Sequence, residues 1–310
     1  MEKIGLVLSG GGARSICQVG VIKILEKEKF PVDIITGTSM GAIIGSIYAL
    51  TKNAEYLEEL ILKFSQSKEI KKIEKSFYRE RTSKIKDRIV CIMKDLFFLI
   101  LDSFKIGIIS SNEFQEYITQ YLGTDFSFND TKIQLGIIST NFTTGKVTIF
   151  NKGKIVPAVT ASSAIPVWIT PVEINKEKYI DGGLSSNLGV LANAFLGGEK
   201  IVAIENEPCL SFEKPLNSFD VLIQGEKIKS RYTSSLEGSF SDYLIKISLP
   251  GVEWFNFSKS KICIKTGEKI TLDNLKKIEG VLFSKNFLLI ELRKKILEEM
   301  KDYFSTGISL

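Results

Sequence analysis

The 310-residue sequence contains no histidine at all. This absence excludes a Ser-His-Asp triad, a Cys-His pair and any metal centre held by imidazole, because each of these needs at least one histidine. Acid–base chemistry in this chain must therefore use carboxylates, lysine, tyrosine or cysteine.

Cysteine and long apolar runs are also scarce. The four cysteines are widely scattered and form no C-x-x-C pair, which argues against a disulfide scaffold and against a thiolate zinc site. They are Cys17, Cys91, Cys209 and Cys263. No stretch approaches the roughly 20 apolar residues that span a bilayer, and the apolar stretch at 4–8 is too short for a signal peptide. We therefore expect a cytoplasmic protein that uses neither a metal nor another cofactor.

What is present is typical of a globular protein. Hydrophobic residues make up 44% and charged residues 25%, which excludes a disordered or collagen-like chain. The net charge is +5, and the stretch from Lys68 to Arg88, with nine basic and four acidic residues, accounts for all of it. A local basic patch of this kind suits anionic lipid better than nucleic acid, which we do not expect as a partner.

Hydrophobic periodicity predicts an α/β fold. Strands at 4–9 and 33–38 with a helix over 16–27 between them imply a right-handed crossover and a parallel sheet. Residues 40–50 are apolar nearly all round and predict a buried helix, and an amphipathic helix is expected over 54–64. Further strands are expected at 133–139, 147–150, 172–174, 179–180, 201–205 and 243–247, and two closing helices at 272–283 and 285–303.

We expect one catalytic domain over residues 1–310, with two additions. The first is a basic amphipathic insertion at about 68–104, where apolar residues recur at three- and four-residue steps beside the basic run. These residues are Ile85, Ile89, Ile92, Leu96 and Leu99. Such a helix can lie in the headgroup boundary of an anionic membrane; the alternative is a solvated helix that covers the active site. The second is a C-terminal helical extension at about 270–310.

The first motif is the run Gly10-Gly11-Gly12-Ala13-Arg14. It lies between an expected strand and an expected helix, where backbone amides suit an anion such as a phosphate or an oxyanion. A tight turn would also explain it. A nucleotide-binding module is the rival from another class, but the run is one residue short of the dinucleotide fingerprint, and the second strand does not end in an acidic residue.

The second motif, Gly37-Thr38-Ser39-Met40-Gly41, has the form G-x-S-x-G. It falls between an expected strand and a buried helix, which is the context of a nucleophile elbow. The two glycines make room for a sharp turn that exposes the serine hydroxyl. Ser39 could instead simply cap the helix.

The third motif is Asp181-Gly182-Gly183, after an expected strand. Asp-Gly alone is a common turn signal. Without histidine, however, a serine needs another base within hydrogen-bond reach, and a carboxylate is the natural candidate. An aspartate beside glycines could approach the serine in a desolvated site, which would raise its basicity.

In this order, the motifs resemble those of the patatin-like phospholipase family, in its bacterial form. Residues 10–25 follow that family's G-G-G-x-R-G-x-x-x-x-G-V-x-x-x-L opening, and residues 37–49 match its nucleophile region. Residues 161–166 resemble its A-S-x-A-x-P segment, and Asp181-Gly182-Gly183 with Asn187 completes the series. The resemblance covers residues 4 to about 207, and the remaining C-terminal residues match no motif.

The resemblance implies a three-layer α/β/α fold with a mostly parallel central sheet. It also implies a catalytic dyad, with Ser39 as nucleophile and Asp181 as proton acceptor. The oxyanion-hole residues that it implies are Gly10, Gly11, Gly12 and Arg14. The remaining motif glycines are Gly37, Gly41, Gly182 and Gly183.

Two positions depart from the family pattern. Ser15 stands where glycine usually follows the arginine, and Leu188 stands where proline often follows the asparagine. We expect neither to take part in the chemistry. Ser15 could narrow the oxyanion loop and so affect the rate.

The predicted activity is hydrolysis of phospholipid or related lipid esters through an acyl-serine intermediate. Two alternatives share the same residues: an acyltransferase, which differs only in the acceptor of the acyl group, and an inactive scaffold that binds partners. The sequence leaves the lipid, the chain-length preference and the oligomeric state undetermined.

Overall fold

The computed structural model describes residues 2–71, 74–75, 107–124, 126–207, 218–284 and 286–306. The strands are β1 (Ile4–Leu8), β2 (Ile34–Thr38), β3 (Gly107–Ile109), β4 (Gln134–Asn141), β5 (Val147–Phe150), β6 (Val167–Ile169), β7 (Val172–Ile174), β8 (Glu177–Asp181), β9 (Lys200–Asn206), β10 (Tyr243–Ile247) and β11 (Phe304–Thr306). The α-helices are α1 (Cys17–Lys27), α2 (Met40–Thr51), α3 (Ala54–Gln66), α6 (Ser111–Leu122), α7 (Ile155–Ser162), α8 (Val190–Phe195), α9 (Ser218–Gly238), α10 (Ser260–Phe283) and α11 (Phe287–Glu299). Short 3₁₀ helices are η1 (Gly12–Ile16), η2 (Phe128–Asp130), η3 (Gly182–Leu184), η4 (Phe257–Lys259) and η5 (Lys301–Tyr303).

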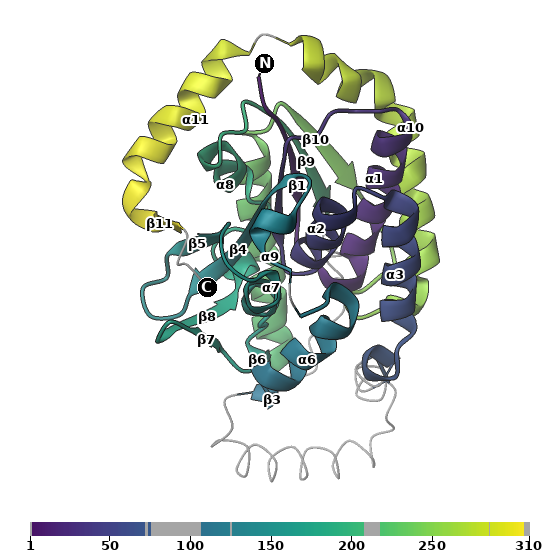
Figure 1. The fold of residues 1–310 in the computed structure, drawn as a ribbon, viewed down its shortest axis with the longest axis vertical. Coiled ribbons are helices and arrows are strands. Elements are labelled where there is room, and N and C mark those ends of the chain that lie inside the picture. The colour runs from purple at the N-terminus through teal and green to yellow at the C-terminus, as the bar shows by residue number, and fades with distance from the viewer. Residues whose placement is uncertain are drawn as a thin grey trace.

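A mixed sheet forms the centre of the molecule (Figure 1). The described strands run in the order β10-β9-β1-β2-β4-β5-β11; off this path, β8 pairs with β4, and β7 pairs with β8. All neighbours from β10 to β4 are parallel, whereas β5 and β8 are antiparallel to β4. This confirms the predicted α/β class, the mostly parallel sheet and the β1–α1–β2 unit at its start.

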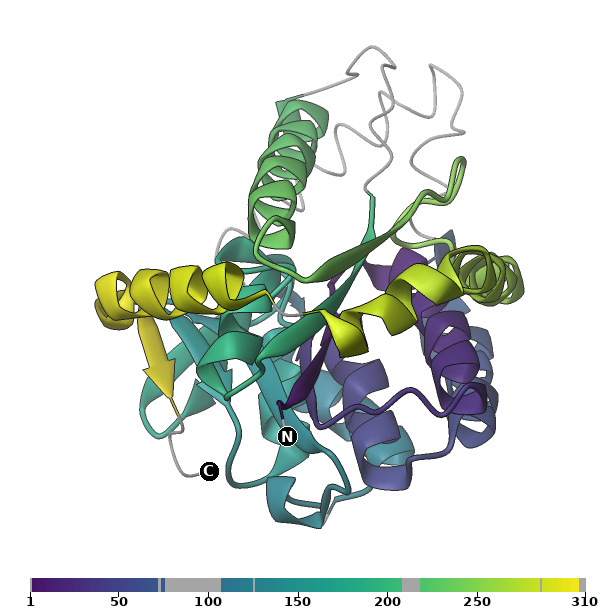
Figure 2. The ribbon, with the colours of Figure 1, turned by 90° about the horizontal axis from the view of Figure 1, so that it is seen from above.

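Helices cover both faces of this sheet (Figure 2). Leu6 and Leu8 of β1 point into the larger core, which also contains apolar residues of α1, α2, α7 and α10. Val7, between them, points to the opposite face and packs with Leu188 and Val190 beside α8. Alternate residues of a strand face opposite sides, so the all-buried pattern of β1 follows from a helix layer on each side. The three-layer prediction is confirmed.

The register of β4 brings two strand ends together. Along one edge, β4 pairs first with β2, up to Thr38 opposite Ile138, and then with β8, starting from Asp181 opposite Ser139. The other edge of β4 is taken by β5. Since β2 is parallel and β8 antiparallel to β4, the two strands run toward each other, and the residue after β2 meets the last residue of β8.

The two predicted additions fare differently. The C-terminal region contains α10 and α11, but α10 begins at Ser260, earlier than predicted, and β11 returns to pair with β5, so the region is not purely helical. The predicted insertion at 68–104 lies mostly outside the described residues; residues 68–71 and 74–75 continue as helix after α3. In the described part of the chain, no helix is both long and apolar enough to cross a membrane.

Candidate active site

Ser39 and Asp181 meet where β2 and β8 run toward each other. The Asp181 carboxylate is buried and accepts hydrogen bonds from the Gly183 amide, at 2.7 Å, and from the Ser39 side chain. Burial raises the pKa of Asp181 to about 6, against the opposing effect of these two donors. The structure therefore brings together the two residues that the sequence singled out, and it gives the carboxylate the raised basicity expected of a desolvated group.

The backbone at Ser39 has the conformation of a nucleophile elbow. Its φ of 54° and ψ of −120° lie in a strained region of backbone conformation, which a non-glycine residue adopts only when the surrounding structure holds it there. A Cβ on Gly41 would lie 2.3 Å from the Leu8 carbonyl oxygen, and one on Gly37 would lie 2.5 Å from the Gly41 carbonyl oxygen. Both positions therefore require glycine for the helix to start so close to the sheet.

Ser162 fixes the elbow from the adjacent helix α7. Its hydroxyl accepts a hydrogen bond from the Ser39 amide at 2.9 Å and donates one to the Ile138 carbonyl at 2.5 Å. Because Ser162 belongs to the segment 161–166, this motif of the sequence has a physical role: it holds the strained turn that carries Ser39.

The glycine-rich loop lies beside Ser39. A Cβ on Gly10 would be 3.4 Å from the Cβ of Ser39, and Gly11 and Gly12 have φ values of 145° and 58° that favour glycine. The Gly10 amide donates to the Asn187 carbonyl at 3.3 Å. Of the three amides expected in an oxyanion hole, that of Gly10 therefore already has a partner within the protein.

Asn206, at the end of β9, holds this loop and was not predicted. Its amide nitrogen is placed to donate to the Ser9 hydroxyl at 2.8 Å, the Gly10 carbonyl at 3.0 Å and the Ser15 hydroxyl at 3.1 Å. The hydroxyl of Ser15, which departs from the family pattern, thus takes part in this network. Arg14 is buried and lies near Cys17: burial raises the pKa of the Cys17 thiol well above its usual value, and Arg14 offsets only part of that rise.

The loop after Asp181 is fixed by glycines and by a carboxylate from a distant helix. A Cβ on Gly182 would lie 2.3 Å from the Ile138 carbonyl oxygen. Glu237 of α9 accepts hydrogen bonds from the Ser186 hydroxyl at 2.5 Å and from the Leu188 and Gly189 amides at 3.0 and 3.3 Å. Proline has no amide hydrogen, so the second departure from the family pattern supplies a donor that Glu237 uses.

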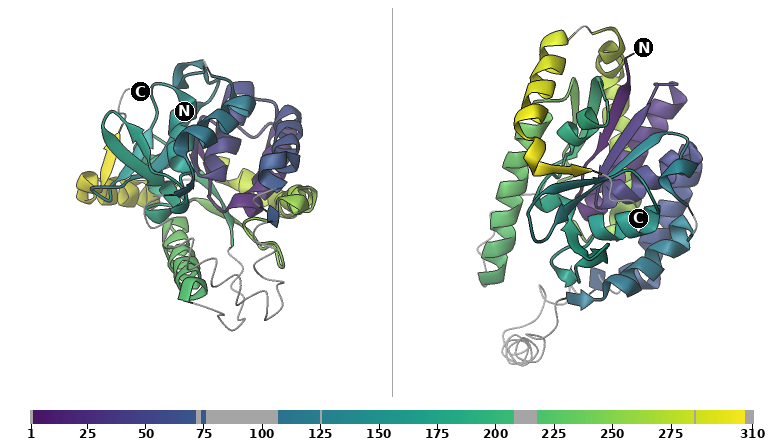
Figure 3. Two further views of the ribbon diagram at one scale, coloured as in Figure 1. Left: turned by 90° about the horizontal axis from the view of Figure 1, so that it is seen from below. Right: turned by 60° about the vertical axis from the view of Figure 1, so that its left-hand side comes forward.

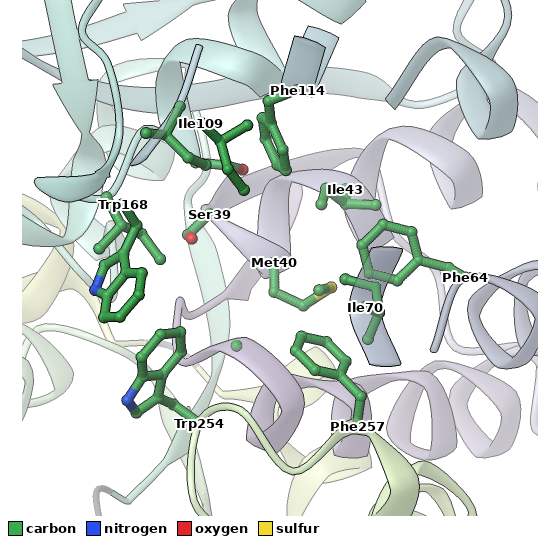
Figure 4. A pocket seen from close by; sticks show the side chains of 14 residues that line it. Ser39, Met40, Ile43, Phe64, Ile70, Ile109, Phe114, Trp168, Trp254 and Phe257 are labelled. Atoms are coloured by element: carbon green, nitrogen blue, oxygen red, sulfur yellow. The ribbon is translucent and has the colours of Figure 1, made fainter. Parts of the chain in front are cut away.

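An apolar cavity of about 100 Å³ opens beside the serine (Figure 4). Trp168 and Trp254, with ring centroids 6.1 Å apart, form one wall, and Phe64, Ile70 and Phe257 lie on the far side. The other residues that line the cavity are Gly12, Ser39, Met40, Ile43, Ile109, Phe114, Ser163, Ile165 and Ile169. Such a surface suits a hydrocarbon chain whose reactive end lies at Ser39.

No metal site is apparent among the described residues, where no group of three or more carboxylates and thiols could share an ion. Asp33, the acidic residue closest to the second strand, accepts a hydrogen bond from the Ile4 amide at the amino end of the sheet, remote from the glycine-rich loop.

The comparison with known families agrees with this geometry. The model of the patatin-like phospholipase family matches residues 6–193, a span that contains the glycine-rich loop, the elbow and Asp181. The chain belongs to this family. The match ends within α8, so it leaves out Asn206, Glu237 and the whole of α9.

Curated relatives of this family member include two fungal enzymes. Lysophospholipase NTE1 of Meyerozyma guilliermondii is 29% identical over 204 residues, and that of Candida albicans is 30% identical over the same number, each across 66% of this chain. The matched part covers only 12% and 13% of those proteins. Among solved structures, VipD from Legionella pneumophila aligns with 89% of this chain and 67% of its own, at 19% identity and a TM-score of 0.46.

Proposed function

We propose that this protein is a serine acyl hydrolase that releases fatty acid from a lipid ester. The observation that carries the proposal is the pairing of the Ser39 hydroxyl with a buried carboxylate whose pKa is about 6, at the edge of an apolar cavity. At neutral pH, Asp181 is mostly ionised and can accept the serine proton, which a carboxylate of ordinary acidity would do less well.

The reaction has two halves. Ser39 Oγ attacks the ester carbonyl while Asp181 takes the proton of the hydroxyl. The bond to the ester oxygen then breaks, and that oxygen receives the proton from Asp181 and leaves as an alcohol. Water, activated by Asp181, hydrolyses the acyl-serine and releases the fatty acid. Because the Gly10 amide has a partner, the proposed donors to the oxyanion are the amides of Gly11 and Gly12, each worth about 3 kcal/mol in the transition state.

The proposed substrate class is a phospholipid or lysophospholipid. Two features support it: the cavity beside Ser39 is lined almost entirely by apolar side chains, and the fungal relatives are named lysophospholipases. An apolar cavity binds the acyl chain through its hydrophobic surface and leaves the ester at the serine.

A fluorophosphonate probe tests the proposed nucleophile. We expect the wild-type protein to be labelled and to hydrolyse a p-nitrophenyl ester, and Ser39→Ala to lose both while keeping its melting temperature within a few degrees. Ser163→Ala is the matched control, because Ser163 also lines the cavity but has no role in the proposed mechanism. Labelling that survives in Ser39→Ala and disappears in Ser163→Ala would refute the assignment.

Peripheral contact with an anionic membrane through residues 68–104 is a further part of the proposal. It rests on the nine basic residues between 68 and 88 and on the apolar residues that follow them. Sedimentation with phosphatidylglycerol vesicles at low and high salt tests it, and unchanged binding after neutralisation of those basic residues would contradict it. The cytoplasmic location stays a prediction.

A further inference from the structure

Along helix α9, several polar side chains face the rest of the protein, whereas apolar side chains are exposed on the opposite face. Lys227, Ser234 and Glu237 contact the rest of the protein, through an ion pair with Glu253 and through hydrogen bonds to the residues after Asp181. Five of its exposed residues form what we name the α9 stripe: Val221, Gly225, Ile228, Tyr232 and Leu236. The other exposed residues of the described part of the helix are polar: Glu226, Lys229, Arg231 and Ser235. A helix at the surface of a globular protein normally has the opposite arrangement.

The geometry of a helix makes the α9 stripe continuous. At 3.6 residues per turn, its five positions fall within about a quarter of the helix circumference and extend over about 22 Å, opposite the face that holds the inward residues. The side chains of Val221, Ile228, Tyr232 and Leu236 are 55%, 54%, 73% and 56% exposed. Figures 2 and 3 show α9 projecting away from the sheet, beyond the other described helices and strands.

Basic side chains border the α9 stripe. Lys229 and Arg231 lie on either side of it and are exposed, although Lys229 also pairs with Glu226 at 2.7 Å. Both side chains of that pair are about half exposed, so the ion pair is weak and does not prevent an interaction with a negatively charged partner. An apolar stripe with cations along its borders complements the acyl–headgroup boundary of an anionic bilayer.

We infer that α9 is a membrane-binding helix whose stripe enters the headgroup region of an anionic lipid bilayer. The inference deepens the proposed function, on which it rests for the lipid nature of the substrate. Its second support is the attachment of α9 to both sides of the site. Lys227 pairs at 3.2 Å with Glu253, the neighbour of Trp254 in the cavity wall, and Glu237 holds the loop that follows Asp181.

This double attachment gives the helix a fixed place relative to the dyad. A membrane bound to the α9 stripe therefore holds the cavity and Ser39 at a constant position above the lipid surface. An enzyme free in solution would have to orient itself relative to the lipid at each encounter. Binding through α9 fixes this orientation in advance.

Vesicle cosedimentation tests the inference with the inactive Ser39→Ala protein, so that no lipid is consumed. In vesicles of phosphatidylcholine and phosphatidylglycerol at 7:3 and low salt, Ile228→Ser/Tyr232→Ser/Leu236→Ser should lower the partition coefficient at least about tenfold. Lys229→Gln/Arg231→Gln removes two exposed charges, of which Arg231 also lies close enough to the buried Glu205 to offset part of the rise in pKa that burial gives that carboxyl. This variant should lower the partition coefficient by about tenfold at low salt and little at high salt. The control is Phe287→Ser/Leu288→Ser in α11, where two side chains of similar apolar character are 65% and 87% exposed; it should bind within about twofold of the parent.

The same substitutions, made with Ser39 intact, should leave hydrolysis of a soluble p-nitrophenyl ester within about twofold. If the wild-type protein does not hydrolyse the soluble ester, the proposed function is refuted. The inference about the membrane-binding helix is tested separately, by the vesicle-binding measurement alone. Three results would overturn the inference: no binding of the parent at low salt, equal binding of the α9 variants, or α9 variants that bind normally but change the molar mass in solution. The last would assign the stripe to contact between two copies of the chain.

Discussion

The edge of the sheet that carries Ser39 and Asp181 is tightly packed, whereas helix α9 is largely exposed on one face. At the edge, backbone segments approach so closely that Gly41 and Gly182 have room for no side chain, and a buried carboxylate faces the serine. In α9, a Cβ added at Gly225 would have no atom within 4 Å, and apolar side chains point to solvent. Close packing therefore limits which residues the edge can contain, whereas the exposed face of α9 places no such limit on its residues.

This difference explains which region carries recognisable motifs. A position that allows only glycine, or only one polar partner, appears in the sequence as a fixed pattern such as G-x-S-x-G. A helix face that binds lipid needs only apolar side chains at a helical spacing, and many different residues meet this requirement. The active-site edge is therefore visible as a motif, whereas the role proposed for α9 emerges only when its orientation is known.

The largest effect is expected at Asp181. Asp181→Asn keeps an acceptor for the Gly183 amide but cannot take a proton from Ser39, so ester hydrolysis should fall by about 10³-fold or more. Steady-state hydrolysis of a p-nitrophenyl ester measures this. Asp130→Asn, a change of the same size at an exposed carboxylate of η2, should keep full activity. Comparable activity in the two variants would remove Asp181 from the mechanism.

The raised pKa of Asp181 also predicts two pH dependences. Activity should fall as pH drops through about 6, because the protonated carboxyl cannot accept the serine proton. Burial favours the neutral form of Asp181 in the folded state. The ionised carboxylate therefore lowers the free energy of unfolding above about pH 6, and this destabilisation disappears as the pH falls toward 3.8, the ordinary pKa of an aspartate. Asp181→Asn should therefore be more stable than wild type by about 1–3 kcal/mol at pH 7.5, with a smaller difference at pH 4.5.

Thermal unfolding at both pH values measures this difference. The control has the opposite sign: hydrogen bonds from Ser127 lower the pKa of Asp130, so its contribution to stability is present above the unfolded pKa and is lost in acid. Asp130→Asn should thus be less stable than wild type at pH 7.5. An Asp181→Asn protein that is destabilised at neutral pH would contradict the burial argument.

Two glycine substitutions compare the regions directly. Gly41→Ala would place a methyl group 2.3 Å from the Leu8 carbonyl and should lower the free energy of unfolding by about 2–3 kcal/mol, with loss of activity. Gly225→Ala meets open space in the middle of α9 and should raise it by about 0.5–1 kcal/mol with unchanged hydrolysis of a soluble ester. Urea unfolding measures both, and equal effects of either sign would show that the two glycines are not placed as described.

Much of the fold was predictable because its signals are local. Apolar runs such as those of β1 and β9 mark strands covered on both faces, and the apolar helix α2 could only be buried. Helix α9 was not predicted, since its apolar residues lack the usual relation to a core. Strand β11 has three residues, and pairing with β5 alone makes it a strand.

The sequence by itself indicated the reaction class to be considered and the two residues proposed to carry it. The lack of histidine demanded another base, and the motifs placed Ser39 and Asp181 at strand ends, because turns of this sharpness require particular residues nearby. Only the tertiary structure decided that β2 and β8 share one edge of β4, that Asn206 and Glu237 hold the two loops, and that α9 turns its apolar face outward. These are contacts between residues distant in the chain, and no local preference encodes them.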